Sequence, residues 1–366
     1  MPIIKSIQTG NWSDLGTSDS YKEITISAVT IANAVVTYTI RTESESRPNK
    51  DSWTCFLKDT TTIRFERDET GYTDDEYVEW EVTEFESGEI SVQSGAQACT
   101  ADPTDITISA ITSGKAVPIL FFKTDLLADT QKEFMPEPSF TSTTNLRLDF
   151  QATPGTDDYY LTWQVVEFNS ADVSIQTGSA SWNNNQSPKD VTISSVTINN
   201  CWVLGFNATS DVGVSTKFGK NLSRNYLSDS TSLYLENIIT SPSIIVIYCT
   251  WFVVEFLDGT TVQNGTSNIT DTNTTLNITL TTIDQSNTSI MNHYRFMNFS
   301  SDATAGDSAQ ESLHTKKLTS TTNMQYERFT GNGDVSVAWF AIEWALEVAT
   351  IHRRGIMDGV ARGVGR

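Results

Sequence analysis

The sequence repeats one pattern four times, and this repeat constrains the fold more than any other feature. A tryptophan opens a short, mostly apolar run that carries a glutamate four residues later and ends on an aromatic residue. The run begins at Trp80, Trp163, Trp251 and Trp339, so its copies lie 83, 88 and 88 residues apart. Four copies at a nearly constant spacing predict four structural units of one kind.

Two further motifs accompany each copy in a fixed order. A glutamine motif (apolar residue, Gln, polar residue, Gly) begins at Ile7, Val92, Ile175 and Val262. A second motif alternates apolar residues with Thr or Ser and begins at Ile24, Ile106, Val191 and Ile278. These motifs predict four units with the boundaries 1–87, 88–170, 171–258 and 259–346, followed by a basic, Gly-rich tail at 347–366.

Each unit has the pattern of short β-strands. The segments 34–40, 119–123 and 202–206 are rich in β-branched and aromatic residues, and helical periodicity is absent before the C-terminus. Five or six short strands in about 85 residues predict an all-β chain of four tandem antiparallel β-sandwich or small-barrel repeats. A propeller blade has about half this length, which makes a propeller the weaker alternative.

No Pro-, Gly- or Ser-rich linker separates the units. Residues 85–90 instead match a hairpin that turns at Ser87-Gly88. That hairpin and its counterparts pair each tryptophan with the glycine of the following unit: Trp80 with Gly95, Trp163 with Gly178 and Trp251 with Gly265. A glycine leaves room for an indole to lie across the sheet. Such short junctions predict a stiff rod of four units.

This pairing scheme leaves one strand unpaired at each end of the chain, and three arrangements resolve it. The N-terminal strand closes onto the last Trp strand as a ring, or completes the Trp strand of a neighbouring subunit, or each glutamine strand belongs to its own unit. A rod keeps its ends apart, so closure ranks last. Pairing between subunits is slightly favoured over self-contained units.

The repeated side chains have a structural and a functional interpretation. A row of tryptophans can stack on sugars, but their regular strand position favours core packing. Period-two alternation places a glutamate on the same face as each tryptophan: Glu84, Glu167, Glu255 and Glu343. A catalytic carboxylate seldom occurs four times in one chain, so we expect these glutamates to cap backbone amides.

The composition argues against several classes of function. The formal net charge is −21, whereas duplex nucleic acid and anionic membranes attract basic surfaces. Only three histidines occur (His293, His314 and His352), and HExxH, GxSxG and phosphate-binding Gly loops are absent. We therefore expect a protein that is not an enzyme, needs no cofactor, and binds neither nucleic acid nor membrane.

Metal and redox motifs are weak. Acidic residues before two of the tryptophans are secondary Ca²⁺ candidates, with a solvated turn as the favoured alternative: Asp74, Asp75, Asp157 and Asp158. The four cysteines (Cys55, Cys99, Cys201 and Cys249) lack CxxC spacing. Cys201 and Cys249 share a unit and have the option of pairing, but buried thiols are the favoured expectation.

The end regions add a docking candidate. No long apolar segment opens the chain, so no secretory signal is expected, and the many N-x-S/T sequons are attributed to an Asn- and Thr-rich composition. In the tail, four arginines face a single acid, Asp358: Arg353, Arg354, Arg362 and Arg366. They form either part of a flexible tail or a docking peptide for an acidic partner.

The three motifs in series, covering about residues 3–346, resemble tandem β-repeats of uncharacterised bacteriophage and prophage structural proteins. That resemblance implies a virion protein (tail, fibre, adaptor or capsid decoration) whose partners are other copies of itself and other virion proteins. The alternative is a bacterial cell-surface adhesin or carbohydrate-binding protein, located extracellularly and recognising a host surface glycan. A polysaccharide-degrading enzyme is the least favoured interpretation.

Overall fold

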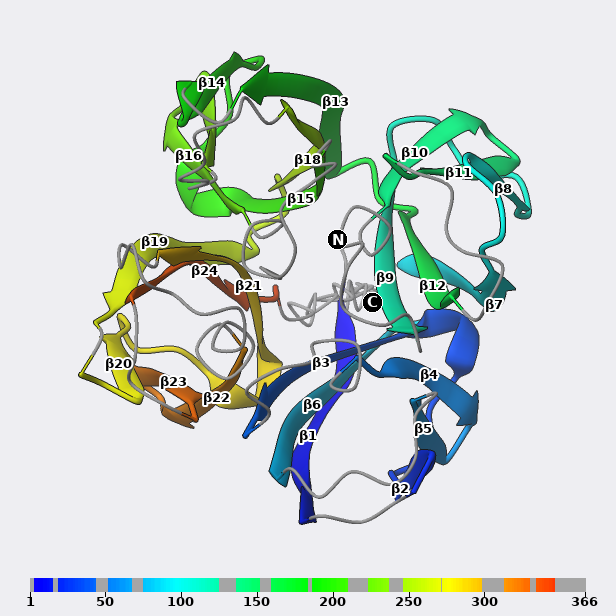
Figure 1. Cartoon of the computed structure of the whole chain (residues 1–366), viewed down its shortest axis with the longest axis vertical. Helices are drawn as coiled ribbons and strands as arrows, with labels where there is room; N and C mark the ends of the chain where they lie inside the picture. The colour runs from blue at the N-terminus through cyan, green and yellow to red at the C-terminus, as the bar shows by residue number, and fades with distance from the viewer. Residues whose placement is uncertain are drawn as a thin grey trace, which may run out of the picture.

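The computed structural model describes residues 3–15, 19–43, 52–67, 75–124, 136–151, 159–183, 186–209, 223–236, 246–270, 272–297, 313–329 and 334–345. These residues form 24 strands in eight three-stranded sheets, as Figure 1 shows, and the only helices among them are short 3₁₀ turns. No helix in these ranges is long and apolar enough to cross a membrane. The fold is all-β.

Each unit contributes six strands. Unit 1 contains β1 (Ile4–Leu15), β2 (Tyr21–Thr25), η1 (Ile31–Asn33), β3 (Ala34–Thr42), β4 (Thr54–Asp59), β5 (Thr62–Glu66) and β6 (Asp75–Phe85). Unit 2 contains β7 (Ile90–Ala98), β8 (Thr104–Thr107), β9 (Ala116–Thr124), β10 (Glu137–Ser142), β11 (Asn145–Asp149) and β12 (Tyr159–Phe168). Unit 3 contains β13 (Val173–Asn183), β14 (Lys189–Thr192), η4 (Ile198–Asn200), β15 (Cys201–Thr209), β16 (Arg224–Asp229), β17 (Ser232–Glu236) and β18 (Val246–Phe256). Unit 4 contains β19 (Thr261–Ile269), β20 (Thr275–Thr279), η6 (Gln285–Asn287), β21 (Thr288–Met297), β22 (His314–Ser320), β23 (Asn323–Arg328) and β24 (Asp334–Glu343).

Every unit is a sandwich of two antiparallel sheets. In unit 1 the inner sheet has the order β1-β6-β3 and the outer sheet the order β2-β5-β4, and the other units repeat this topology. In β6 the side chains from Glu76 to Val82 alternate between buried and half-buried positions, as a strand with one face in a core requires. The sheets remain open at their edges, so the sandwich alternative is correct and the small barrel is not.

The predicted pairing of each tryptophan with the next unit's glycine is wrong. Each repeated tryptophan lies opposite the glycine of its own unit: Trp80 opposite Gly10, Trp163 opposite Gly95, Trp251 opposite Gly178 and Trp339 opposite Gly265. The turn at Gly88 (φ +90°) joins β6 to β7 across two different sheets. Counting residues from that turn gives the right kind of pair in the wrong unit, because every unit carries both motifs.

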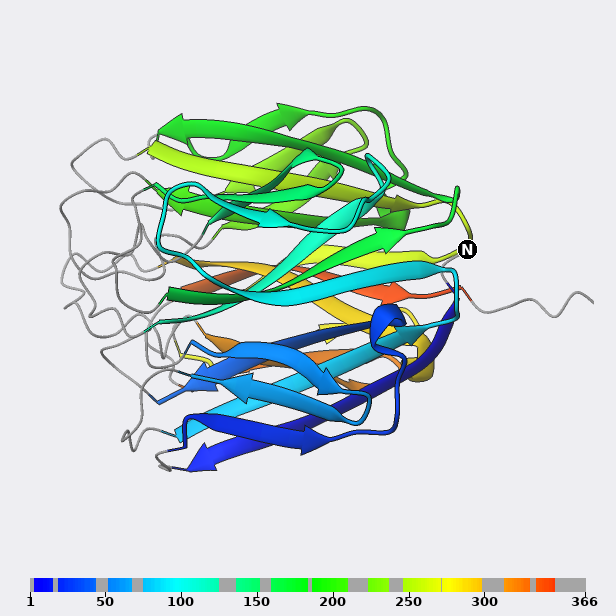
Figure 2. The same ribbon diagram turned by 90° about the vertical axis from the view of Figure 1, so that its right-hand side faces the viewer.

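The predicted rod is also wrong, because the four units form a closed ring. Figure 1 looks down the ring and shows unit 4 beside unit 1, and Figure 2 shows the strands running roughly along the ring axis. Across this contact Arg41 lies 2.6 Å from Glu327, and the hydroxyls of Thr83 and Ser289 are 3.0 Å apart. Neither the N-terminal closure nor the favoured pairing between subunits is present, since β1 pairs with β6 of its own unit.

The aromatic residues that end the four Trp strands meet near the centre of the ring. Phe85, Phe168, Phe256 and Trp344 are all buried and belong to one apolar cluster. Trp344 contacts Phe85 edge-to-face at 5.0 Å and Phe256 at 5.3 Å, and Phe168 lies 6.0 Å from Phe256. Trp344 also donates a hydrogen bond from its indole to Ser289 (3.0 Å). One aromatic residue per unit thus builds a core shared by the whole ring.

Candidate functional site

The repeated tryptophans lie over the glycines of the neighbouring strand. A Cβ placed on Gly10 would come within 2.5 Å of the Trp80 ring, and at Gly95 it would come within 2.7 Å of the Trp163 ring. Trp80, Trp163 and Trp251 are buried in the cores of their own units. Their faces are therefore not available as a row of sugar-stacking platforms.

The repeated glutamates accept hydrogen bonds from backbone amides. The four bonds run from Thr30 N to Glu84 (2.8 Å), Thr112 N to Glu167 (2.6 Å), Thr197 N to Glu255 (2.7 Å) and Asp284 N to Glu343 (3.0 Å). Burial alone would raise the pKa of Glu84, but the Thr30 amide and the Lys5 ammonium outweigh it and lower that pKa. Each carboxylate fixes the loop that leads into the third strand of its unit.

The glutamine motif and the Ile-Thr motif are bonded to each other, a link that the sequence does not reveal. In every unit the glutamine side chain accepts from the backbone N–H and donates to the backbone C=O of one residue in the second motif. The pairs are Gln8 with Ser27, Gln93 with Ser109, Gln176 with Ser194 and Gln263 with Thr281. All three motifs therefore build the unit.

The remaining sequence candidates do not gather at a site. Asp75 begins β6, whereas Asp74, Asp157 and Asp158 lie outside the described residues, as do Arg353, Arg354, Arg362 and Arg366. The described residues contain no group of three His, Cys, Asp or Glu that suits a metal ion. All four cysteines are buried and free, so Cys201 and Cys249 do not pair.

The most varied polar chemistry lies where one unit meets the next. The residue after the repeated tryptophan faces the third strand of the preceding unit, and it is the position that changes. Between units 1 and 2, Gln164 accepts from Val36 N (3.0 Å) and donates to Val36 O (2.8 Å). It thereby satisfies the open edge of β3, which would otherwise expose unpaired backbone groups.

The other junctions solve the same problem differently. Between units 2 and 3 the position of Val36 is taken by Pro118, which has no N–H, and the position of Gln164 is taken by Phe252. Between units 3 and 4 the residue is Phe340. Between units 4 and 1 it is Glu81, which faces Ile290. Variation at one position within otherwise constant repeats was the sequence signal for these junctions.

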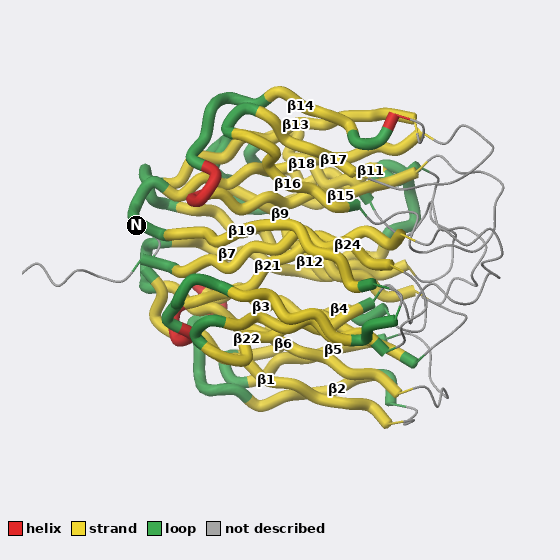
Figure 3. The backbone as a smooth tube through the Cα atoms, turned by 90° about the vertical axis from the view of Figure 1, so that its left-hand side faces the viewer, coloured by secondary structure: helices red, strands yellow, loops and turns green. Residues whose placement is uncertain are grey.

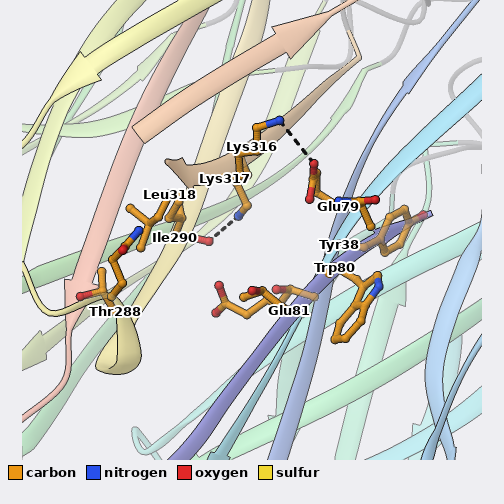
Figure 4. A pocket seen from close by; sticks show the side chains of 14 residues that line it. Tyr38, Glu79, Trp80, Glu81, Thr288, Ile290, Lys316, Lys317 and Leu318 are labelled. Carbon is orange, nitrogen blue, oxygen red and sulfur yellow. Dashed lines mark hydrogen bonds and ion pairs between the residues drawn. The ribbon is translucent and has the colours of Figure 1, made fainter. Parts of the chain in front are cut away.

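The contact between units 4 and 1, here called the closing seam, surrounds a cavity of about 370 Å³ (Figure 4). Its charged lining consists of Glu79 and Glu81 from β6 and Lys316 and Lys317 from β22. Lys317 lies 3.8 Å from Glu79 and 3.3 Å from Glu327. Burial raises the pKa of Glu79 and Glu81 and lowers that of Lys316 to about 8.

Comparison with protein-family models and with curated proteins found no match for this chain. The interpretation of the site therefore depends on its geometry.

Proposed function

We propose that the chain is a non-enzymatic structural component of a virus particle that acts through protein–protein assembly. The observation that supports this is the use of the repeated polar residues. The glutamates and the motif glutamines all bond to backbone groups within the unit, as in Glu167 to Thr112 and Gln93 to Ser109. A side chain held in this way preserves a shape and has no reaction to perform.

The ring supplies such a rigid shape. Figure 3 shows that strands make up nearly all of the described backbone, and the aromatic residues at the centre tie the four units together. The resemblance of the three motifs to phage structural repeats supports a place in a virion. Partners of this kind, other virion proteins or further copies of the chain, bind through preformed surfaces at low conformational cost.

The first test is mass spectrometry of purified particles from cells that express the chain. We expect the chain in particles at a fixed copy number relative to the major structural protein. Its absence from particles, together with binding of the purified chain to defined glycans on an array, would replace the proposal by the adhesin or carbohydrate-binding alternative.

The second test concerns the basic tail as the docking element. Deletion of residues 351–366 is expected to leave the melting temperature unchanged and to abolish incorporation into particles. The matched control replaces Arg353, Arg354, Arg362 and Arg366 by lysine, which keeps the positive charge and should retain incorporation. Normal incorporation of the deletion variant would exclude docking through the tail.

A further inference from the structure

The closing seam differs in chemistry from two of the other three junctions. Between units 2 and 3, Phe140 contacts Phe252 edge-to-face at 6.4 Å, and between units 3 and 4, Tyr226 packs on the cluster that contains Phe340. The seam instead brings together the charged side chains of Glu79, Glu81, Lys316 and Lys317, and Arg41 pairs with Glu327 across it.

At the seam, two charged residues divide the task that one neutral amide performs between units 1 and 2. The Glu81 carboxylate accepts hydrogen bonds from the Ile290 amide, from Ser289 and from Thr83 (3.1 Å). The Lys316 ammonium donates to the Ile290 carbonyl. Ile290 occupies the position of Val36, as its pairing two residues beyond the repeated tryptophan shows. Glu81 and Lys316 together thus reproduce the two bonds of Gln164.

The charged version costs free energy when the seam is closed. In a favourable ion pair the carboxylate pKa falls and the ammonium pKa rises. Here the pKa of Glu81 is raised and that of Lys316 is lowered, so burial outweighs their mutual attraction. A buried pair of this kind contributes less stability than a neutral contact of the same shape.

We propose that the closing seam is the junction at which the ring opens, and that opened chains pair seam to seam with a second copy of the chain. The surface of β22 in one copy fits β3 and β6 of another, because Lys316 and Lys317 meet Glu79 and Glu81, and Arg41 meets Glu327. The contact is heterologous, so two opened chains close into one ring of eight units by the same bonds. This inference concerns the ring itself and does not depend on the proposed function.

The test locks the seam covalently. Thr83→Cys together with Ser289→Cys places two thiols where two hydroxyls lie 3.0 Å apart. The unlocked chain, after incubation at high protein concentration in mild urea and return to buffer, is expected to show dimers in size exclusion with light scattering. The oxidised variant should remain monomeric under the same treatment, and reduction should restore its dimers. The two single-cysteine variants serve as controls for the substitutions themselves.

A second measurement keeps the inference falsifiable without dimers. Hydrogen exchange should be about tenfold faster at the Ile290 amide than at the Val36 amide, because the seam opens first. The double variant Glu81→Gln, Lys316→Met should remove that difference and suppress the dimers. Equal exchange at the two amides in the unmodified chain, or dimers that form equally with the seam locked, would overturn the inference.

Discussion

Replacing Gln164 by leucine tests how the units of the ring hold together. Gln164 is 4% exposed, and its amide makes both bonds to the backbone of Val36. Leucine has a similar size but no polar atoms, so the variant leaves a buried N–H and a buried C=O without partners. Each such group costs about 1–3 kcal/mol, and we expect a total loss of about 2–4 kcal/mol.

The matched control is Gln176→Leu, because Gln176 also makes two bonds to one backbone residue, Ser194. That clasp lies within unit 3 at a solvent-accessible position, where water replaces the lost bonds, so its loss should cost only about 0.5–1.5 kcal/mol. Urea unfolding followed by tryptophan fluorescence compares the free energies of the two variants. Hydrogen exchange at the Val36 amide reports the junction directly. Equal destabilisation of the two variants, with unchanged exchange at Val36, would refute the reasoning.

Three further predictions concern packing, pH and thiol reactivity. Gly95→Ala should destabilise the chain by about 1–3 kcal/mol because its methyl group meets the Trp163 ring at 2.7 Å, and adding Trp163→Phe should recover part of that loss in urea unfolding. Burial raises the pKa of Glu137 from 4.5 to about 7, so the folded chain binds the extra proton and stability falls by about 3 kcal/mol as pH rises from 4.5 through 7. Glu137→Gln should remove that part of the pH dependence, and an unchanged slope would contradict the assignment. Burial raises the pKa of Cys99 and Cys201 to about 12, so a thiol reagent near neutral pH should label neither until the chain is unfolded, and rapid labelling of the native protein would show that the thiols are accessible.

The sequence by itself determined the unit and its repetition. Period-two alternation, β-branched runs and a recurring Trp-to-Glu spacing are local properties, and they predicted an all-β chain of four like sandwiches. The pairing of a tryptophan with a glycine was also readable, because only a residue without a side chain admits an indole at that position. Even the change from Gln164 to Phe252 is visible in the printed sequence, although its meaning is not.

The tertiary structure alone decided which glycine each tryptophan meets and where the chain ends lie. Identical motifs in every unit make pairing within a unit and pairing between units indistinguishable by residue counting. Ring closure depends on contacts between residues more than 200 positions apart, such as Thr83 with Ser289, which no local pattern encodes. The role of Lys316 follows from the same cause: its partners Glu81 and Ile290 come from different units, and only the closed ring brings them together.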